Sequence, residues 1–308
     1  MIEMFSSGWP LYAVASLFGL LVGSFLNVVI LRLPARLMHD WRMQSRDLLG
    51  LNEEINLPSA IEPGINVEDP AFSHPADPAP PDLVFTASHC PSCKHPLSPF
   101  ENIPLLSWLV LRGRCRHCKA PISAQYPLVE ALTAIAAFVV VWKFGFSWQA
   151  AAGLLLSFSL IALAGIDFHT QLLPDHITLP LLWLGLLLSL DTLFVSPSQA
   201  ILGAAIGYLS LWSVFWLFKW MTGKEGMGYG DFKLLAALGA WMGPLSLLPV
   251  ILMSSLVGAI VGSIALLAKG QDRSTPIPFG PFIAAAGWTQ LIAGDSLQGM
   301  YWRLLGGS

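Results

Sequence analysis

Charged residues are scarce in this chain. They make up 11% of its 308 residues and hydrophobic residues make up 55%, whereas soluble proteins average about 25% charged residues. A water-soluble protein of this length would need more polar groups to cover its surface, so the sequence excludes that class. The mean hydropathy of +0.64 agrees with this exclusion. We therefore predict a membrane protein.

Other absences exclude further classes. The net charge is −3, and no clustered basic face is present, which argues against a nucleic-acid-binding protein. No internal repeat of fixed period is visible, which argues against a transporter built from two similar halves. No glycine-rich dinucleotide fingerprint occurs, so the sequence alone does not indicate a nucleotide-like cofactor.

Hydrophobic residues fall in runs long enough to cross a membrane. A helix of about 20 residues spans a hydrocarbon core of about 30 Å, and several segments approach this length. These segments are 10–31, 127–142, 149–166, 177–195, 199–218, 232–243, 245–268 and 279–294. We predict an all-α polytopic membrane protein with about eight transmembrane helices. The Gly243-Pro244 break fits either a tight turn or a kink within one long span.

The polar part of the sequence is concentrated in one long loop. We divide the chain into a first transmembrane helix (1–31), a loop (32–126) and a membrane-embedded C-terminal domain (127–308). Within the loop, 37–85 is predicted to be a flexible insertion because residues 50–82 are rich in Pro, Asp, Glu and Asn. The first helix is predicted to be a permanent anchor, since its basic residues follow the apolar run.

Lys and Arg gather on one side of the predicted bundle. If eight spans alternate in direction, fourteen of the sixteen basic residues lie on the side of the long loop, and only Lys143 and Arg303 lie on the other. The positive-inside rule then places this loop in the cytoplasm and both termini outside.

The long loop contains all four cysteines of the chain. They form two C-x2-C elements, Cys90 with Cys93 and Cys115 with Cys118. Two such elements supply four thiolates for a tetrahedral zinc ion. The alternative is two disulfides, which would require an oxidising compartment. The cytoplasmic placement favours zinc, and a shell closed by four cysteines favours a structural role over a catalytic one.

Two aspartates lie at the ends of apolar helices, where an acidic residue indicates a functional site. Asp167 ends the third span, and Asp231 begins the sixth after the glycines Gly228 and Gly230. Alternation places both on the cytoplasmic side. Two close carboxylates that share one proton are the minimum for aspartic proteolysis, and the glycines would let an extended substrate approach closely. Taken singly, each aspartate could be a helix cap or an interfacial residue.

Three more charged residues lie near the same side. Asp175 follows Pro174 before an apolar run, so we predict mainly a helix N-cap, with a direct role as the alternative. Lys233 could bias the charge of Asp231 or orient a substrate carboxylate, and a snorkelling interfacial lysine is the other interpretation. Glu130 is a further intramembrane acid at the start of the second span.

These motifs together resemble a type IV prepilin peptidase. The resemblance covers nearly the whole chain apart from the variable 37–85 stretch. Besides the paired C-x2-C elements and Asp167, the matching stretches are 23–29, 104–108, 113–115, 126–130, 167–175 and 228–233.

The resemblance implies a bifunctional enzyme of the bacterial inner membrane. Such an enzyme cleaves the basic leader from prepilins or type II secretion pseudopilins after a glycine and N-methylates the new amino terminus with S-adenosylmethionine. Asp167 and Asp231 match the family's catalytic aspartates, and 127–308 would form the peptidase domain. The four-Cys segment 86–120 would belong to the methylation half, where Gly113 matches a glycine linked to that activity. Arg114 keeps the charge but not the geometry of the lysine found in some members.

Two other function classes remain open from the residues themselves. A proton-coupled transporter could use Asp167 and Asp231 as relay groups, but its carboxylates would be expected near the bilayer midplane. A non-catalytic assembly factor for pili or secretion would explain the zinc site but leaves the Gly-x-Gly-Asp motif without a role.

A prepilin presents a basic leader before an apolar helix, so its cleavage site lies at the cytoplasmic membrane surface, where both aspartates are predicted.

Overall fold

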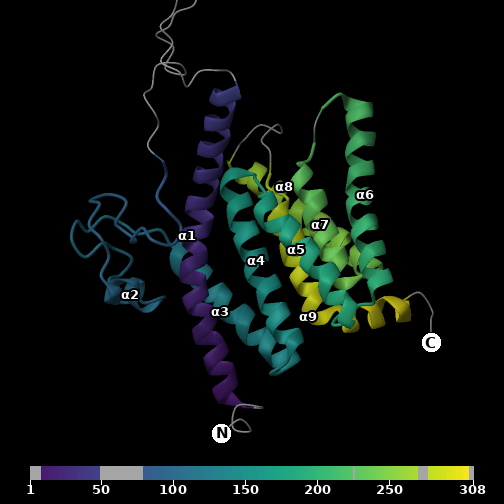
Figure 1. Ribbon diagram of the computed structural model, residues 1–308, viewed down its shortest axis with the longest axis horizontal. Coiled ribbons are helices and arrows are strands. Elements are labelled where there is room, and N and C mark those ends of the chain that lie inside the picture. The colour runs from purple at the N-terminus through teal and green to yellow at the C-terminus, as the bar shows by residue number, and fades with distance from the viewer. Residues whose placement is uncertain (1–7, 49–78, 225, 270–276, 305–308) are drawn as a thin grey trace, which may run out of the picture.

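A computed structural model describes residues 8–48, 79–224, 226–269 and 277–304 of the chain. Within these ranges every regular element is a helix and no strand forms, which confirms the predicted all-α class (Figure 1). The long helices are α1 (Trp9–Leu48), α3 (Gln125–Phe144), α4 (Trp148–Thr170), α5 (Asp175–Leu188), α6 (Pro197–Thr222), α7 (Tyr229–Met242), α8 (Leu247–Lys269) and α9 (Gly280–Leu304). The short ones are α2 (Leu106–Val110) and the 3-10 turns η2 (Pro99–Asn102), η3 (Ser189–Asp191) and η4 (Pro244–Ser246).

Each predicted apolar segment falls on one of the long helices. In the described part of the chain, five stretches are long and apolar enough to cross a membrane: α1, α3, α4, α6 and Pro244–Ile264. Helices α5 and α7 have 14 residues each, about 21 Å at 1.5 Å per residue, which is short for a hydrocarbon core of about 30 Å. The chain is therefore a multi-pass membrane protein, but the predicted count of eight spans is not confirmed.

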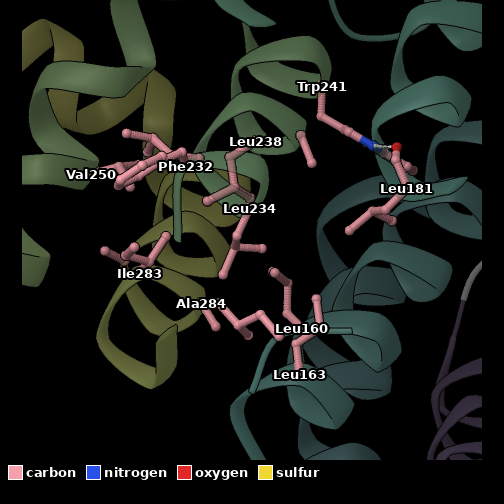
Figure 2. Close-up of a cluster of buried hydrophobic side chains, with 14 of the residues drawn as sticks. Leu160, Leu163, Leu181, Phe232, Leu234, Leu238, Trp241, Val250, Ile283 and Ala284 are labelled. Atoms are coloured by element: carbon pink, nitrogen blue, oxygen red, sulfur yellow. Dashed lines mark hydrogen bonds between the residues drawn. The ribbon is translucent and has the colours of Figure 1, made fainter. Parts of the chain in front are cut away.

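The short helix α7 lies at the centre of the hydrophobic core. Of its residues, all from Asp231 to Trp241 except Lys233 are buried, as expected for a helix enclosed on all sides. Figure 2 shows Leu234 and Leu238 of α7 among side chains of α4 and α9, while the Trp241 indole donates a 2.8 Å hydrogen bond to the carbonyl of Leu181. This burial in protein explains why a helix too short for the bilayer is still almost wholly apolar.

Glycines allow two pairs of helices to pack backbone against backbone. A Cβ atom on Gly203 of α6 would collide with the carbonyl of Gly239 of α7. A Cβ atom on Gly23 of α1 would lie 2.7 Å from Cα of Glu130 in α3. Small residues at such crossings are typical of membrane helix packing. The second contact fixes α1 against the beginning of α3.

Helix α1 is longer than the predicted first span. It continues through the buried Pro34 and ends at Leu48, so residues 37–48 are helical instead of part of a flexible insertion. The charged residues after position 31 mark the end of the apolar run but do not break the helix, because most of them are good helix formers. The rest of the predicted insertion up to residue 78 lies outside the described residues.

The Gly243-Pro244 break separates two helices. Helix α7 ends at Met242, Gly243 adopts a positive φ of 76°, and η4 leads into α8. Of the two predicted alternatives, a turn is observed, because the positive φ at glycine and the proline after it both end the helix.

Candidate active site and metal centre

The two aspartates lie at neighbouring helix ends. Asp167 is in the last turn of α4 and Asp231 is in the first turn of α7. Their exposed fractions are only 5% and 7%, and they are close enough for their charges to repel each other. Buried like charges in proximity are the arrangement that makes two carboxylates share a proton.

A glycine at the start of α9 holds the first carboxylate. The backbone N–H of Gly280 donates a 2.9 Å hydrogen bond to Oδ2 of Asp167. A Cβ atom on Gly280 would lie 2.7 Å from the same oxygen, so no other residue fits without a shift. Sequence reasoning missed this residue. The signal was a glycine between two prolines, Pro278 and Pro281, directly before an apolar helix.

The glycines before Asp231 serve close packing and access, and their backbone φ angles are not positive. Gly228 is the N-cap of α7 and has a φ of −80°, and neither Gly228 nor Gly230 is among the positive-φ residues of the described chain. A Cβ atom on Gly230 would lie 2.6 Å from Cβ of Leu173, while Gly228 is exposed and its nearest neighbour would be Oδ2 of Asp231 at 3.9 Å. The approach to Asp231 is therefore open.

Leu173 joins the two halves of the site. It lies in the connection between α4 and α5 and is buried. A Cβ atom on Gly230 would contact the Leu173 side chain, and a Cβ atom on Gly280 would lie 3.1 Å from Cδ2 of Leu173. Three elements that are distant in sequence thus meet on one apolar side chain beside the carboxylates.

Asp175 and Lys233 form an ion pair at the edge of the site. Both carboxylate oxygens of Asp175 lie 2.7 Å from Nζ of Lys233. Asp175 is the first residue of α5 and Pro174 occupies the N-cap without a side-chain hydrogen bond, so the predicted N-cap is wrong. The Asp175 carboxylate instead forms the ion pair with Lys233, and this pair links α5 to α7.

The four cysteines converge as predicted. Their sulfur atoms all lie within 4.8 Å of one another, with 3.8 Å between Cys90 and Cys118 and 4.0 Å between Cys93 and Cys115. All four are free thiols. A tetrahedral ion with metal–sulfur bonds of about 2.3 Å requires sulfur–sulfur separations of about 3.8 Å. The group could therefore hold a metal ion.

The two C-x2-C elements have the same local structure. In each, the N–H of the first cysteine donates to a carbonyl five residues later, and the N–H of the following lysine donates back to that cysteine. Lys94 and Lys119 both have a φ of 59°. The N–H groups of Cys93 and Ser92 lower the pKa of the Cys90 thiol to about 6, which favours its ionised form. The pKa of the Cys93 thiol is raised to about 11 by burial and by the other three cysteines.

Gly113 and Arg114 differ in their surroundings. Gly113 is buried with a φ of 66°, and a Cβ atom there would lie 2.9 Å from the indole ring of Trp108. Arg114 is exposed and forms an isolated bridge with Pro121. The glycine is thus required by the close approach of Trp108, which the sequence could not reveal.

Glu130 fixes the beginning of α2. Its Oε2 accepts a 2.8 Å hydrogen bond from the N–H of Leu105, which has a positive φ of 58°. The carboxylate thereby ties the loop with α2 to α3, and Figure 1 shows this loop on the α1 side of the molecule.

The fold and the site together define an all-helical membrane protein with a paired-aspartate site and a four-cysteine loop. Comparison with protein families agrees: residues 17–144 match the bacterial peptidase A24 N-terminal domain and residues 154–263 match the type IV leader peptidase family. The chain belongs to the type IV leader peptidase family.

Its relatives are similar over nearly their full length. A protein of Xanthomonas campestris pv. campestris is 53% identical over 97% of this chain and 96% of its own. Proteins of Pseudomonas aeruginosa (51%, over 94% and 93%) and Stutzerimonas stutzeri (50%, over 93% and 92%) are also similar. Each is named a prepilin leader peptidase/N-methyltransferase. No solved structure matches the chain.

Proposed function

We propose that this protein is a membrane aspartic endopeptidase and N-methyltransferase. Its substrates are prepilins or type II secretion pseudopilins, which it processes at the cytoplasmic face of the bacterial inner membrane. The observation that carries the proposal is the pair of buried carboxylates, Asp167 and Asp231, at the ends of α4 and α7. Membership of the type IV leader peptidase family and the names of the relatives support it.

In cleavage one carboxylate acts as the general base and the other as the general acid. The ionised one takes a proton from the attacking water, and the protonated one donates a hydrogen bond to the scissile carbonyl. A proton then passes to the leaving amine as the tetrahedral intermediate collapses. The N–H of Gly280 donates a hydrogen bond to Oδ2 of Asp167, so this carboxylate is oriented before substrate arrives.

The position of the pair suits a substrate that crosses the membrane surface. The carboxylates lie at the ends of α4 and α7, and we infer that these ends are at the cytoplasmic boundary, where a basic leader meets an apolar helix. Gly228 is exposed beside Asp231, and this opening would admit an extended backbone. A transporter is not favoured, since the family model and the names of the relatives indicate leader peptidases.

We infer that the ion held by Cys90, Cys93, Cys115 and Cys118 is Zn²⁺ with a structural role. The donor set and the sulfur–sulfur distances fit a four-thiolate shell. Such a shell leaves no position for a reactive water.

Methylation requires a methyl donor, and for this family we infer S-adenosylmethionine. When bound, it supplies an electrophilic methyl group to the new amino terminus. A buried acceptor without a partner, Oδ1 of Asn27, and the buried carboxylate of Glu130 fit a ligand that carries positive charge.

Conservative replacement of each aspartate tests the peptidase. We expect Asp167→Asn and Asp231→Asn each to abolish leader cleavage, because an amide can neither take up nor share the proton. The measurement is the ratio of processed to unprocessed prepilin in cells that co-express the two proteins. Asp191→Asn, at an exposed position of η3, is the matched control and should cleave normally.

Normal processing by either active-site variant, at wild-type levels in the membrane, would refute the assignment. Methylation is tested separately by the mass of the mature amino terminus.

A further inference from the structure

A cavity lies apart from the paired aspartates, between α1, α3 and the Cys-bearing loop. Its volume is about 510 Å³, within the range of about 300–1,000 Å³ that is typical of small-molecule sites. Neither Asp167 nor Asp231 lines it. The cleavage chemistry therefore does not account for it.

Asn27 presents an unused hydrogen-bond acceptor in this cavity. Its side chain is 1% exposed, and its Nδ2 group donates to the carbonyls of Gly23 and Tyr126. Its Oδ1 atom is buried without a hydrogen-bond partner, although it belongs to a residue that lines the cavity. Because buried polar atoms are almost always paired, this oxygen indicates a ligand that donates a hydrogen bond.

Glu130 adds a negative charge to the same cavity. It is 7% exposed and lines the cavity wall. Its Oε2 accepts from Leu105, and Ser24 also interacts with the carboxylate, but both partners are neutral. No cation pairs with it among the residues that the structure describes. A buried carboxylate without a counter-charge favours a cationic ligand.

Trp108 provides a flat apolar wall. Its indole lines the cavity and donates to the carbonyl of Ile122, and the absence of a side chain at Gly113 leaves room for the ring. Aromatic rings of this kind stack on nucleobases. The metal-binding cysteines Cys90 and Cys115 also line the cavity, so its outer wall depends on the metal centre.

We propose that this cavity binds S-adenosylmethionine, with Asn27 and Glu130 holding its positively charged methionyl end and Trp108 packing against its adenine. The inference rests on the proposed N-methyltransferase activity and names the site at which that activity obtains its methyl donor. The ligand offers what these three residues would bind: a hydrogen-bond donor for Asn27, a positive charge for Glu130 and an aromatic ring for Trp108.

Direct binding to the purified full-length protein tests the placement. Equilibrium dialysis with labelled S-adenosylmethionine should give a Kd that is weakened about tenfold or more by Asn27→Leu and by Glu130→Gln. S-adenosylhomocysteine, which lacks the sulfonium charge, should bind wild type more weakly and should lose less affinity on Glu130→Gln. Asp191→Asn is the control for a carboxylate-to-amide change outside the cavity.

Each outcome bears on the proposal. Wild-type affinity in both cavity variants would overturn the placement, and if these variants still methylate, the methyltransferase assignment survives with its site elsewhere. Absence of binding to wild type overturns the placement together with the methyltransferase assignment, whereas leader cleavage is judged by its own assay. Binding of a peptide with the mature pilin amino terminus, but not of the methyl donor, would also overturn it. If either variant fails to keep the wild-type melting temperature, Trp108→Leu replaces it.

Discussion

The carboxylate of Asp167 is positioned by the backbone of a residue 113 positions away. A main-chain N–H cannot rotate as a side-chain donor can, so Oδ2 is held in one direction. The arrangement works only while position 280 is glycine, because a Cβ atom would be 2.7 Å from Oδ2.

We therefore expect Gly280→Ala to lower the rate of leader cleavage by about a hundredfold, the order of effect that a displacement of about 1 Å has on catalysis. The rate is measured with purified enzyme and a synthetic leader peptide. Gly258→Ala in α8 is the matched control, since its Cβ atom would come no closer than 3.2 Å to the Phe282 ring. An unchanged rate in Gly280→Ala would show that this hydrogen bond has no part in cleavage.

At the scale of elements, we expect the two C-x2-C elements to be held together by a metal ion more than by packing. Cys93 and Cys118 are exposed, and the loop around them buries few apolar side chains. Domains of this kind gain most of their folding free energy from the ion. The cavity wall formed by Cys90 and Cys115 should therefore loosen when the metal leaves.

We predict about one zinc per chain and its loss in the Cys90→Ser, Cys93→Ser double variant. Methylation should fall first, since Cys90 and Cys115 line the proposed methyl-donor cavity, while the aspartate pair is built on other helices. Metal analysis and the two activities, assayed on the same sample, check this expectation. Ser92→Ala, between the two cysteines, should retain its zinc. Equal loss of both activities would contradict the separate roles.

The sequence predicted the local features of these elements well. Apolar runs located each long helix, and the cysteine spacing predicted the metal centre, because both signals come from adjacent residues. The contact between Gly280 and Asp167 depends on how α4 and α9 pack, and the Asp175–Lys233 pair depends on how α5 meets α7. Such tertiary contacts leave no periodic signal. The length of α1 was missed because charge marks the edge of a membrane span and not the end of a helix.

At the scale of the whole molecule, the two proposed sites lie at the same end of the helices. Nε2 of His169, two residues after Asp167, lies 2.9 Å from Oε1 of Gln125, which precedes the cavity residue Tyr126. A cleaved pilin would thus remain near the methylation site. Both sites should face the cytoplasm, where the loops rich in Lys and Arg are expected.

Epitope insertion tests this orientation. An epitope placed at 223–224, after α6, should be protected from protease in intact spheroplasts, and one placed at 192–196 should be cleaved. Protease accessibility followed by immunoblotting, with lysed spheroplasts as the control, gives the answer. Exposure of the 223–224 epitope before lysis would invert the topology.

Helix α1 contacts both halves of the molecule. Asn27 lines the cavity. Ile30 packs against Gly165 of α4, two residues before Asp167, so closely that a Cβ atom on Gly165 would lie 2.5 Å from Cδ1 of Ile30. The two family domains meet between residues 144 and 154. By sequence alone, this is where the chain would be cut to express the two domains separately. A fragment that starts there would lack Ile30 and leave the surface of α4 beside Asp167 uncovered. Neither activity should be obtainable as an independent module, and engineering of one must preserve the helix on which the other also depends.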